Sequence, residues 1–76
     1  MQTWNAQTLG KVIRQERQRA GMSQEVLSGL AGIARSHLSM IETGDKQANF
    51  CTVWRLAQAL GLRPSDLVRR VEEYEE

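Results

Sequence analysis

Apolar residues recur along the chain at helical spacing in five blocks, and a glycine closes each of the first four. No stretch shows the strict alternation of a β-strand, and the chain contains no internal repeat or low-complexity linker. Short amphipathic helices joined by tight turns bury their apolar stripes by packing together. The pattern therefore predicts an all-α fold, a compact bundle of five short helices.

Capping residues and helix breakers mark the ends of the first and fifth predicted helices. Either Asn5 or Thr8 caps the first helix, which stops at Gly21. Pro64 opens the fifth helix, because its fixed φ suits the first helical position. The apolar side of the fifth helix consists of Leu67, Val71 and Tyr74.

The second and fourth predicted helices carry large apolar residues that we expect in the core. The second runs from the cap Ser23 to Gly32, and its inward residues are Val26, Leu27 and Leu30. The fourth runs from the cap Asn49 to Gly61. Its apolar stripe consists of Phe50, Val53, Trp54, Ala57 and Leu60.

The third block, from about residue 35 to residue 43, differs between its two sides. Ala34, Leu38 and Ile41 share one narrow sector, which we expect to face the core. A solvated helix face usually carries long Lys and Glu side chains, whereas small hydroxyls let a helix approach another body closely. Simple solvation stays the alternative interpretation. The opposite side consists of Arg35, Ser36, Ser39, Met40 and Thr43.

The second and third predicted helices meet at a short turn, as in a helix-turn-helix. Gly32 can adopt the positive φ that such a turn needs, and Ser28 is small where the two helices cross. The major groove of DNA admits a helix, and hydroxyl and guanidinium groups can donate hydrogen bonds to base edges there. The sequence therefore predicts that the third helix contacts double-stranded DNA.

The stretch "LGKVIRQERQRAGMSQEVLSGLAGIARSHLSMIETG", followed by "NFCTVWRLAQALGLRPSDLV", resembles the phage-repressor and Cro-like, or xenobiotic-response-element (XRE), helix-turn-helix family. The resemblance covers about residues 8–68 and implies one lambda-repressor-like domain over residues 1–76. A short extension, 1–7, and an acidic tail, 69–76, flank it. It also implies a transcriptional regulator, usually a repressor, that binds a palindromic operator as a homodimer.

The resemblance implies roles for individual residues. The base-reading positions are Arg35, Ser36, Ser39 and Met40, and the positions near phosphates are Ser23, Gln24, Thr43, Lys46 and Asn49. Arg35 has the donors for a guanine or for a phosphate, and both stay open. Asp45 would repel a phosphate, so we expect it to point away from the DNA.

Three further expectations concern how the domain is held together and paired. The resemblance implies a salt bridge between Arg17 and Glu42, which fixes the third helix. Ala34 stands where the family often has a Ser or Thr as the N-cap of the third helix. An alanine there makes no capping hydrogen bond, which lowers the stability of the helix by about 1 kcal/mol. The candidate dimer interface is Leu62, Pro64, Val68 and Val71, whereas Leu67 fits a monomer core better.

Composition narrows the function classes. Ten basic and nine acidic residues give a net charge of +1, but six of the basic residues and only four of the acidic ones lie in residues 1–46. The single cysteine, Cys51, can form no internal disulfide, and we expect it half-buried. No apolar run is long enough for a membrane helix, and the stretch "MQTWNAQ", which has neither a basic region nor an apolar run, leads us to expect no secretory signal. We therefore expect a cytoplasmic protein, associated with the nucleoid when bound to DNA.

The sequence contains none of the residue patterns that are typical of a catalytic site. It contains no Ser–His–acid cluster, no paired carboxylates and no glycine-rich phosphate loop, so we expect neither an enzyme nor a cofactor or metal site. A second hypothesis is a protein-interaction module, such as the antitoxin-like partner of another protein, in which the tail "VEEYEE" docks. Salt separates the two, because phosphate contacts make affinity fall steeply with added salt.

Overall fold

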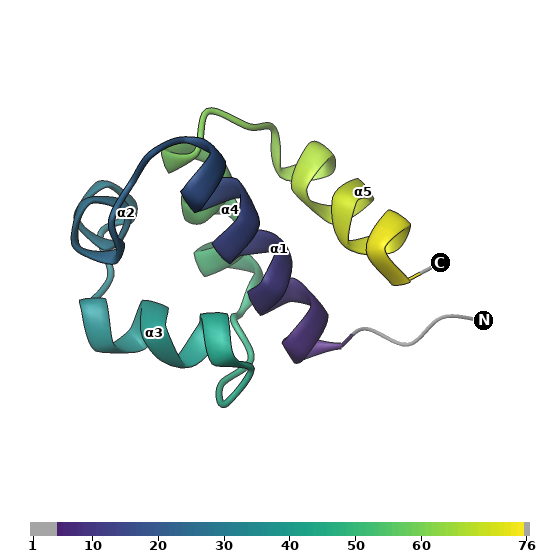
Figure 1. Cartoon of the computed structure of the whole chain (residues 1–76), viewed down its shortest axis with the longest axis horizontal. Coiled ribbons are helices and arrows are strands. Elements are labelled where there is room, and N and C mark those ends of the chain that lie inside the picture. Colours follow the sequence, from purple (N-terminus) through teal and green to yellow (C-terminus); the bar gives the residue numbers. More distant parts are fainter. Residues whose placement is uncertain (1–4, 76) are drawn as a thin grey trace.

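The computed structural model describes residues 5–75 of the chain. Within this range the chain forms five α-helices and no strand (Figure 1). These are α1 (Ala6–Arg19), α2 (Gln24–Ala31), α3 (Arg35–Thr43), α4 (Phe50–Ala59) and α5 (Pro64–Glu75). The prediction of an all-α domain with five helices is confirmed.

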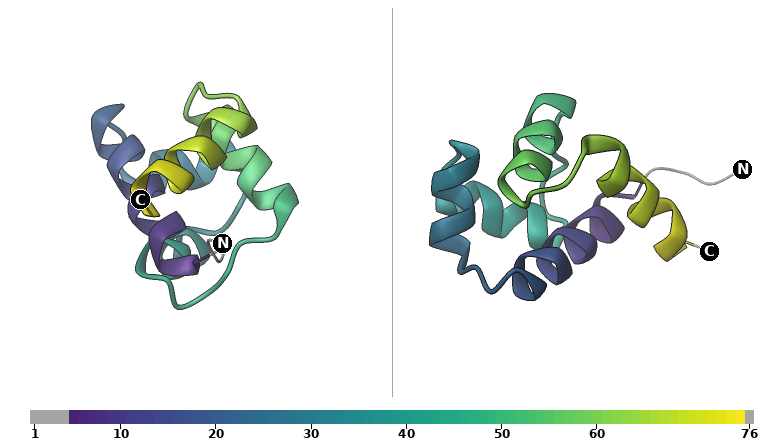
Figure 2. Two further views of the ribbon diagram at one scale, coloured as in Figure 1. Left: turned by 90° about the vertical axis from the view of Figure 1, so that its right-hand side faces the viewer. Right: turned by 90° about the horizontal axis from the view of Figure 1, so that it is seen from above.

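The helices surround one core, with α1 at its centre. α1 packs against both α3 and α5, and α2 packs against α3 and α4. Figure 2 shows α4 beside α5 at the periphery of the bundle. Every helix contributes at least one fully buried side chain, and these are Leu9, Ile13, Leu27, Leu38, Ile41, Leu56 and Leu67.

Gly10 sets the distance between α1 and α3. A Cβ atom at this position would collide with the carbonyl oxygen of Ile41 and lie 2.6 Å from the carbonyl oxygen of Glu42. No side chain fits between the two backbones at this crossing. The closeness of α1 and α3 therefore depends on glycine at residue 10.

Side-chain caps start three of the helices as predicted. The Asn5 side chain accepts hydrogen bonds from the backbone of α1, which settles the choice between Asn5 and Thr8. Ser23 accepts from Val26 N and Asn49 from Thr52 N. Ala34 makes no side-chain cap, so α3 starts with backbone donors that no cap satisfies.

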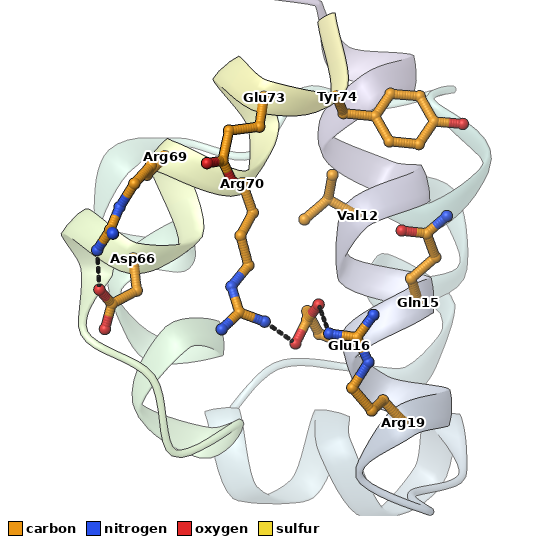
Figure 3. Close-up of a pocket in the computed structure, with 9 residues that line it drawn as sticks. All are labelled: Val12, Gln15, Glu16, Arg19, Asp66, Arg69, Arg70, Glu73 and Tyr74. Atoms are coloured by element: carbon orange, nitrogen blue, oxygen red, sulfur yellow. Dashed lines mark hydrogen bonds and ion pairs between the residues drawn. The ribbon is translucent and has the colours of Figure 1, made fainter.

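A charged cluster links α1 to α5 (Figure 3). The buried carboxylate of Glu16 pairs with Arg70 of α5 and, at 3.2 Å, with Arg19 of its own helix. A hollow of about 610 Å³ opens between the two helices above this cluster. α5 continues to Glu75, so residues 69–75, expected in an acidic tail that flanks the domain, belong to this helix.

The expected orientation of α2 is wrong for two residues. Val26 is 49% exposed and Leu30 is 62% exposed, whereas Ser28 and Ala31 are buried beside Leu27. α2 crosses both α3 and α4, and small residues allow that approach. The larger apolar side chains are left on the outside.

The expected stripe of α4 is also wrong in part. Phe50 is 68% exposed and Trp54 is 46% exposed, because the buried arc of this helix is centred on Val53, Leu56 and Ala57. Cys51 is exposed rather than half-buried. On α5, Tyr74 is exposed although Leu67 and Val71 are buried. On α2 and α4 the buried arc is therefore rotated away from the predicted apolar stripe, whereas on α5 only Tyr74, at the end of the stripe, faces outward.

Candidate nucleic-acid interface

The turn between α2 and α3 has the geometry of a helix-turn-helix. Gly32 ends α2 in the left-handed conformation, with φ of +72°. Its N–H donates to the carbonyl of Gly29, and the N–H of Ile33 donates to the carbonyl of Ser28 at 3.0 Å. These bonds fix the direction in which the chain enters α3. Figure 1 shows α3 at the lower edge of the molecule.

The predicted base-reading residues of α3 reach the surface to different extents. Arg35 and Ser36 are exposed, whereas Ser39 and Met40 are half-buried. Leu38, on the opposite side of the helix, is buried in the core. The outward face of α3 is thus exposed along its first turn and partly covered further along the helix. Small hydroxyls leave room there for a second body.

The predicted ion pair between α1 and α3 is present and buried. Arg17 Nε lies 2.7 Å from Glu42 Oε2, and Arg17 Nη2 lies 3.1 Å from Oε1. The Glu42 side chain is 3% exposed and the Arg17 side chain 12%. Arg17 Nη1 also donates to the Met22 carbonyl at 2.9 Å. The guanidinium therefore ties α1 to the start of the helix-turn-helix as well as to α3.

Gln24 completes this network from α2. Its Nε2 donates to Glu42 Oε1 at 3.1 Å, so the amide braces α3 directly. An amide nitrogen has two hydrogens, which leaves one for a further acceptor such as a phosphate oxygen. We define Arg17, Gln24 and Glu42 as the α3 brace, because they join α1, α2 and α3 at one carboxylate.

A polar cleft of about 460 Å³ opens beside the α3 brace, with walls from α1, α2 and α3. Three guanidinium groups line it against one carboxylate, so the cleft favours an anion. Its lining residues are Arg14, Arg17, Ser23, Gln24, Arg35, Glu42 and Thr43. The structure thus brings the predicted phosphate residues Ser23, Gln24 and Thr43 together with Arg35.

Sequence reasoning missed Arg14. Its side chain is exposed and lines the same cleft as Arg35, and among residues 5–75 neither guanidinium is paired with a carboxylate. The available signal was its position one turn before Arg17 on the same helix, because residues three apart share a face. Arg14 therefore joins the candidate residues of this surface.

Thr43 and Asp45 differ from expectation. The Thr43 hydroxyl lies 3.1 Å from the Met40 carbonyl and 3.0 Å from Asp45 Oδ2. The Asp45 carboxylate is thus beside the predicted phosphate site at Thr43, although we expected it to point away. A hydroxyl has one hydrogen, so its bond to Met40 or Asp45 competes with donation to a phosphate.

The other predicted phosphate residues lie at the ends of helices or in the loop before α4. Lys46 is exposed. Ser23 and Asn49 use their side-chain oxygens as helix caps. Both caps leave backbone N–H groups of the first helical turns free to donate.

The candidate dimer residues divide into two groups. Leu62, Pro64 and Val68 are half-buried and reach the surface. Val71 is buried in the core, so its assignment to the interface is wrong. It closes the monomer core together with Leu67, because both lie on the side of α5 that faces α1 and α4.

A helix-turn-helix whose second helix projects outward defines the class of DNA-binding helix-turn-helix domains. The family profile described as Helix-turn-helix matches residues 13–67 of this chain. The chain belongs to this family, the XRE-type helix-turn-helix transcriptional regulators. None of the helices between residues 5 and 75 has the length and apolar character to cross a membrane.

Two curated relatives are similar in sequence. The uncharacterized HTH-type transcriptional regulator y4dJ of Sinorhizobium fredii (strain NBRC 101917 / NGR234) is 33% identical over 57 residues, which cover 75% of this chain and 74% of that protein. Control protein C.BamHI of Bacillus amyloliquefaciens is 33% identical over 60 residues, which cover 78% of this chain and 74% of that protein. Both matches span most of each chain.

Solved structures share the architecture. The restriction-modification controller protein C.AhdI from Aeromonas hydrophila has a TM-score of 0.79 and 32% identity, over 82% of this chain and 94% of that chain. The clp gene regulator ClgR from C. glutamicum has a TM-score of 0.88 at 20% identity, over 99% of this chain and 97% of that chain. The first supports the family and the second shows the same fold.

Proposed function

We propose that this chain is a sequence-specific repressor that binds a palindromic operator as a homodimer and inserts α3 into the major groove. One observation carries the proposal. The outward face of α3 presents Arg35, Ser36 and Ser39, while the α3 brace fixes the opposite side of that helix. A rigid helix with small donor side chains suits direct contact with base edges.

The two arginines Arg35 and Arg14 have different roles at the proposed DNA surface. Arg35 lies in the first turn of α3 and is the residue that reads a guanine, a contact worth about 1–3 kcal/mol of discrimination. Arg14 lies on α1, outside the recognition helix, and binds a phosphate beside the cleft. Phosphate contacts fix the register of the protein on the duplex without reading sequence.

Loop and cap residues add to the backbone contacts. Lys46 supplies a charge after α3, and the first turns of α2 and α4 supply N–H donors behind their caps Ser23 and Asn49. The second hydrogen of Gln24 Nε2 reaches a phosphate while the first holds Glu42. Thr43 contributes when its hydroxyl leaves Asp45.

A single domain with a few base-reading side chains covers only a few base pairs, too few for selectivity among the sites of a genome. Two copies related by a two-fold axis read two half-sites, so the operator is a palindrome. Similarity to control protein C.BamHI and to the controller protein C.AhdI supports a regulatory role. Repression follows when the operator overlaps a promoter.

Selection of bound duplexes from a random pool tests the proposal. We expect a palindromic motif whose half-sites lie about 10 base pairs apart from centre to centre. A promoter carrying that motif, placed before a reporter gene, should lose expression when the protein is present. Recovery of no motif would contradict specific binding, and increased reporter expression would contradict repression.

A further inference from the structure

The two large apolar residues that α2 leaves outside the core lie on one face of the helix. Val26 is 49% exposed and Leu30 is 62% exposed, and residues four apart are neighbours on a helix surface. Figure 1 shows α2 at the edge of the molecule. Single exposed apolar residues are ordinary on protein surfaces, but two neighbours one turn apart form a continuous apolar strip.

A groove of about 540 Å³ continues this strip between the C-terminal ends of α2 and α4. Leu30 belongs both to the strip and to the groove. Nothing lies within 4 Å of the Cβ positions of Gly29 and Gly32, so the backbone on both sides of Leu30 is open to close approach. We define the α2–α4 groove as Val26 together with the lining residues Leu30, Ala31, Gly32, Arg55, Gln58 and Ala59.

The charge at the α2–α4 groove is positive and unpaired. Arg55 is exposed, and among residues 5–75 its guanidinium forms no ion pair. Of the residues in this range that line the groove, Arg55 is the only charged one. An apolar surface with a free cation at its edge is complementary to a ligand that combines apolar side chains with carboxylates.

An amphipathic helix is the protein segment that offers this combination. Such a helix lays its apolar face into a groove and anchors it with residues at i, i+3 or i+4, and i+7. The described part of the chain contains no strand, so a partner strand finds no sheet edge to extend. We propose that the α2–α4 groove binds an acidic amphipathic helix of a partner protein, whose apolar side chains pack on Val26, Leu30 and Ala59 while its carboxylates pair with Arg55.

The size of the α2–α4 groove suits a transient partner. Two exposed aliphatic side chains and one free guanidinium form a small contact surface. Contacts that bury less than about 1,200 Å² in total are found in transient complexes, whereas permanent complexes bury much more. The bound helix therefore exchanges rather than forming a permanent subunit.

The α2–α4 groove is separate from the proposed DNA surface. Ser23 and Gln24 lie at the start of α2, whereas Leu30 and Ala31 lie at its end. No residue of the groove lines the cleft beside the α3 brace. A chain bound to DNA through α3 therefore keeps the groove open for a partner. This last point rests on the proposed function, whereas the binding of the helix itself does not.

Two synthetic helical peptides of opposite charge test the proposal. Each has about 15 residues and a side-chain cross-link that keeps it helical, because short free helices are marginal in water. Both carry Leu along one face, and the other positions are Glu in the first peptide and Lys in the second. In a fluorescence anisotropy titration, the Glu peptide should bind about five- to tenfold more tightly than the Lys peptide.

Leu30→Ala tests the apolar part of the α2–α4 groove. It should weaken binding of the Glu peptide about fivefold or more, because Leu30 is the most exposed apolar side chain of the groove. Tyr74→Ala is the matched control, since Tyr74 is 45% exposed on α5, outside the groove. It should leave the affinity unchanged.

A charge reversal tests the role of Arg55. Arg55→Glu should invert the preference, so that the Lys peptide binds more tightly than the Glu peptide, which a merely structural role of Arg55 would not produce. Lys11→Glu is the matched control, because it changes the net charge equally but lies exposed on α1. It should keep the preference for the Glu peptide.

Amide chemical shifts in nuclear magnetic resonance spectra locate the bound peptide. The Glu peptide should shift the amides of residues 29–32 and 55–59. Several results would overturn the proposal: no binding of the Glu peptide, equal binding of the two peptides, a preference that Arg55→Glu does not invert, or shifts confined to α3.

A short random-sequence duplex in low-salt buffer separates the two surfaces. The chain saturated with this duplex should bind the Glu peptide as tightly as the free chain does. Displacement of the duplex by the peptide would place the peptide on the DNA surface and would contradict the α2–α4 groove as its site. A wild-type chain that binds the peptide but no duplex would contradict the proposed function and leave the groove supported.

Discussion

Two neighbouring residues of α1 hold two different helices. Arg17 pairs with Glu42 of α3, whereas Glu16 pairs with Arg70 of α5. Both pairs join residues far apart in the sequence, but their surroundings differ. The Arg17–Glu42 pair is almost fully buried and bidentate, while the side chain of Arg70 is 37% exposed beside an open hollow.

The difference shows where the molecule needs a fixed geometry. A buried charge without its partner is costly, so the Arg17–Glu42 pair favours the position of α3 in which the pair stays intact. A partly exposed pair is screened by solvent and fixes its helix less strictly. The proposed DNA-reading helix is therefore the one that is held rigidly, and the orientation of α5 depends more on Leu67 and Val71.

Removal of the buried guanidinium should have the largest effect. Arg17→Ala leaves Glu42 buried with only Gln24 as a side-chain partner, and we expect a loss of about 3–5 kcal/mol in the free energy of unfolding. Urea unfolding followed by circular dichroism measures this loss. A loss below about 1 kcal/mol, the range of surface pairs, would show that α3 does not depend on this pair.

The close crossing of α1 and α3 gives the second prediction. Gly10→Ala should destabilise the fold by about 1–3 kcal/mol or more, because the added Cβ meets carbonyl groups of Ile41 and Glu42. Gly29→Ala on α2 is the matched control, since nothing lies within 4 Å of its Cβ position. It should stabilise the protein by about 0.5–1 kcal/mol. Equal effects in thermal unfolding would argue against the close α1–α3 contact.

The corresponding change at α5 should be smaller. Arg70→Ala removes a half-exposed partner of the buried Glu16, while Arg19 remains beside that carboxylate, so we expect a loss of about 1–2 kcal/mol, smaller than that of Arg17→Ala. The affinity for DNA should stay unchanged, because Arg70 lies away from α3. A loss as large as that of Arg17→Ala in the same urea titration would remove the distinction between the two pairs.

The substitution Asp45→Asn should have the smallest effect, and it should change the affinity for DNA rather than the stability of the fold. Asp45→Asn removes a carboxylate next to Thr43, so affinity for duplex DNA should rise by about two- to fivefold at low salt. The gain should shrink as salt is added, because salt screens exposed charges. A fluorescence anisotropy titration at two salt concentrations measures both, and reduced affinity would show that Asp45 instead orders a contact residue.

Much of this arrangement could be predicted from the sequence because its signals are local. Caps such as Ser23 and the glycine stops bound the helices, and the polar side of the third block marked its outward face. Arg17 and Glu42 lie 25 residues apart, and only the family resemblance paired them. Glu16 and Arg70, 54 residues apart, carried no such signal and were missed.

The errors have a common physical cause. Helical spacing shows which side of a helix is apolar, but the neighbouring helices decide which residues of that side, or next to it, are buried. On α2 the close crossings bury Ser28 and leave Leu30 outside, and on α4 the arc ends before Trp54. Arg14 was overlooked because its role depends on a cleft that three helices form together.

A comparison of Arg35→Ala with Arg14→Ala tests most directly whether α3 is the DNA-reading helix. Both variants should fold, since both side chains are exposed. In selections from a random pool and in salt titrations, Arg35→Ala should lose preference at one position of each half-site. Arg14→Ala should keep the motif, bind more weakly to every sequence, and lower the salt dependence by about one counterion. Unchanged base preference in Arg35→Ala, or the same uniform loss in both variants, would contradict the account.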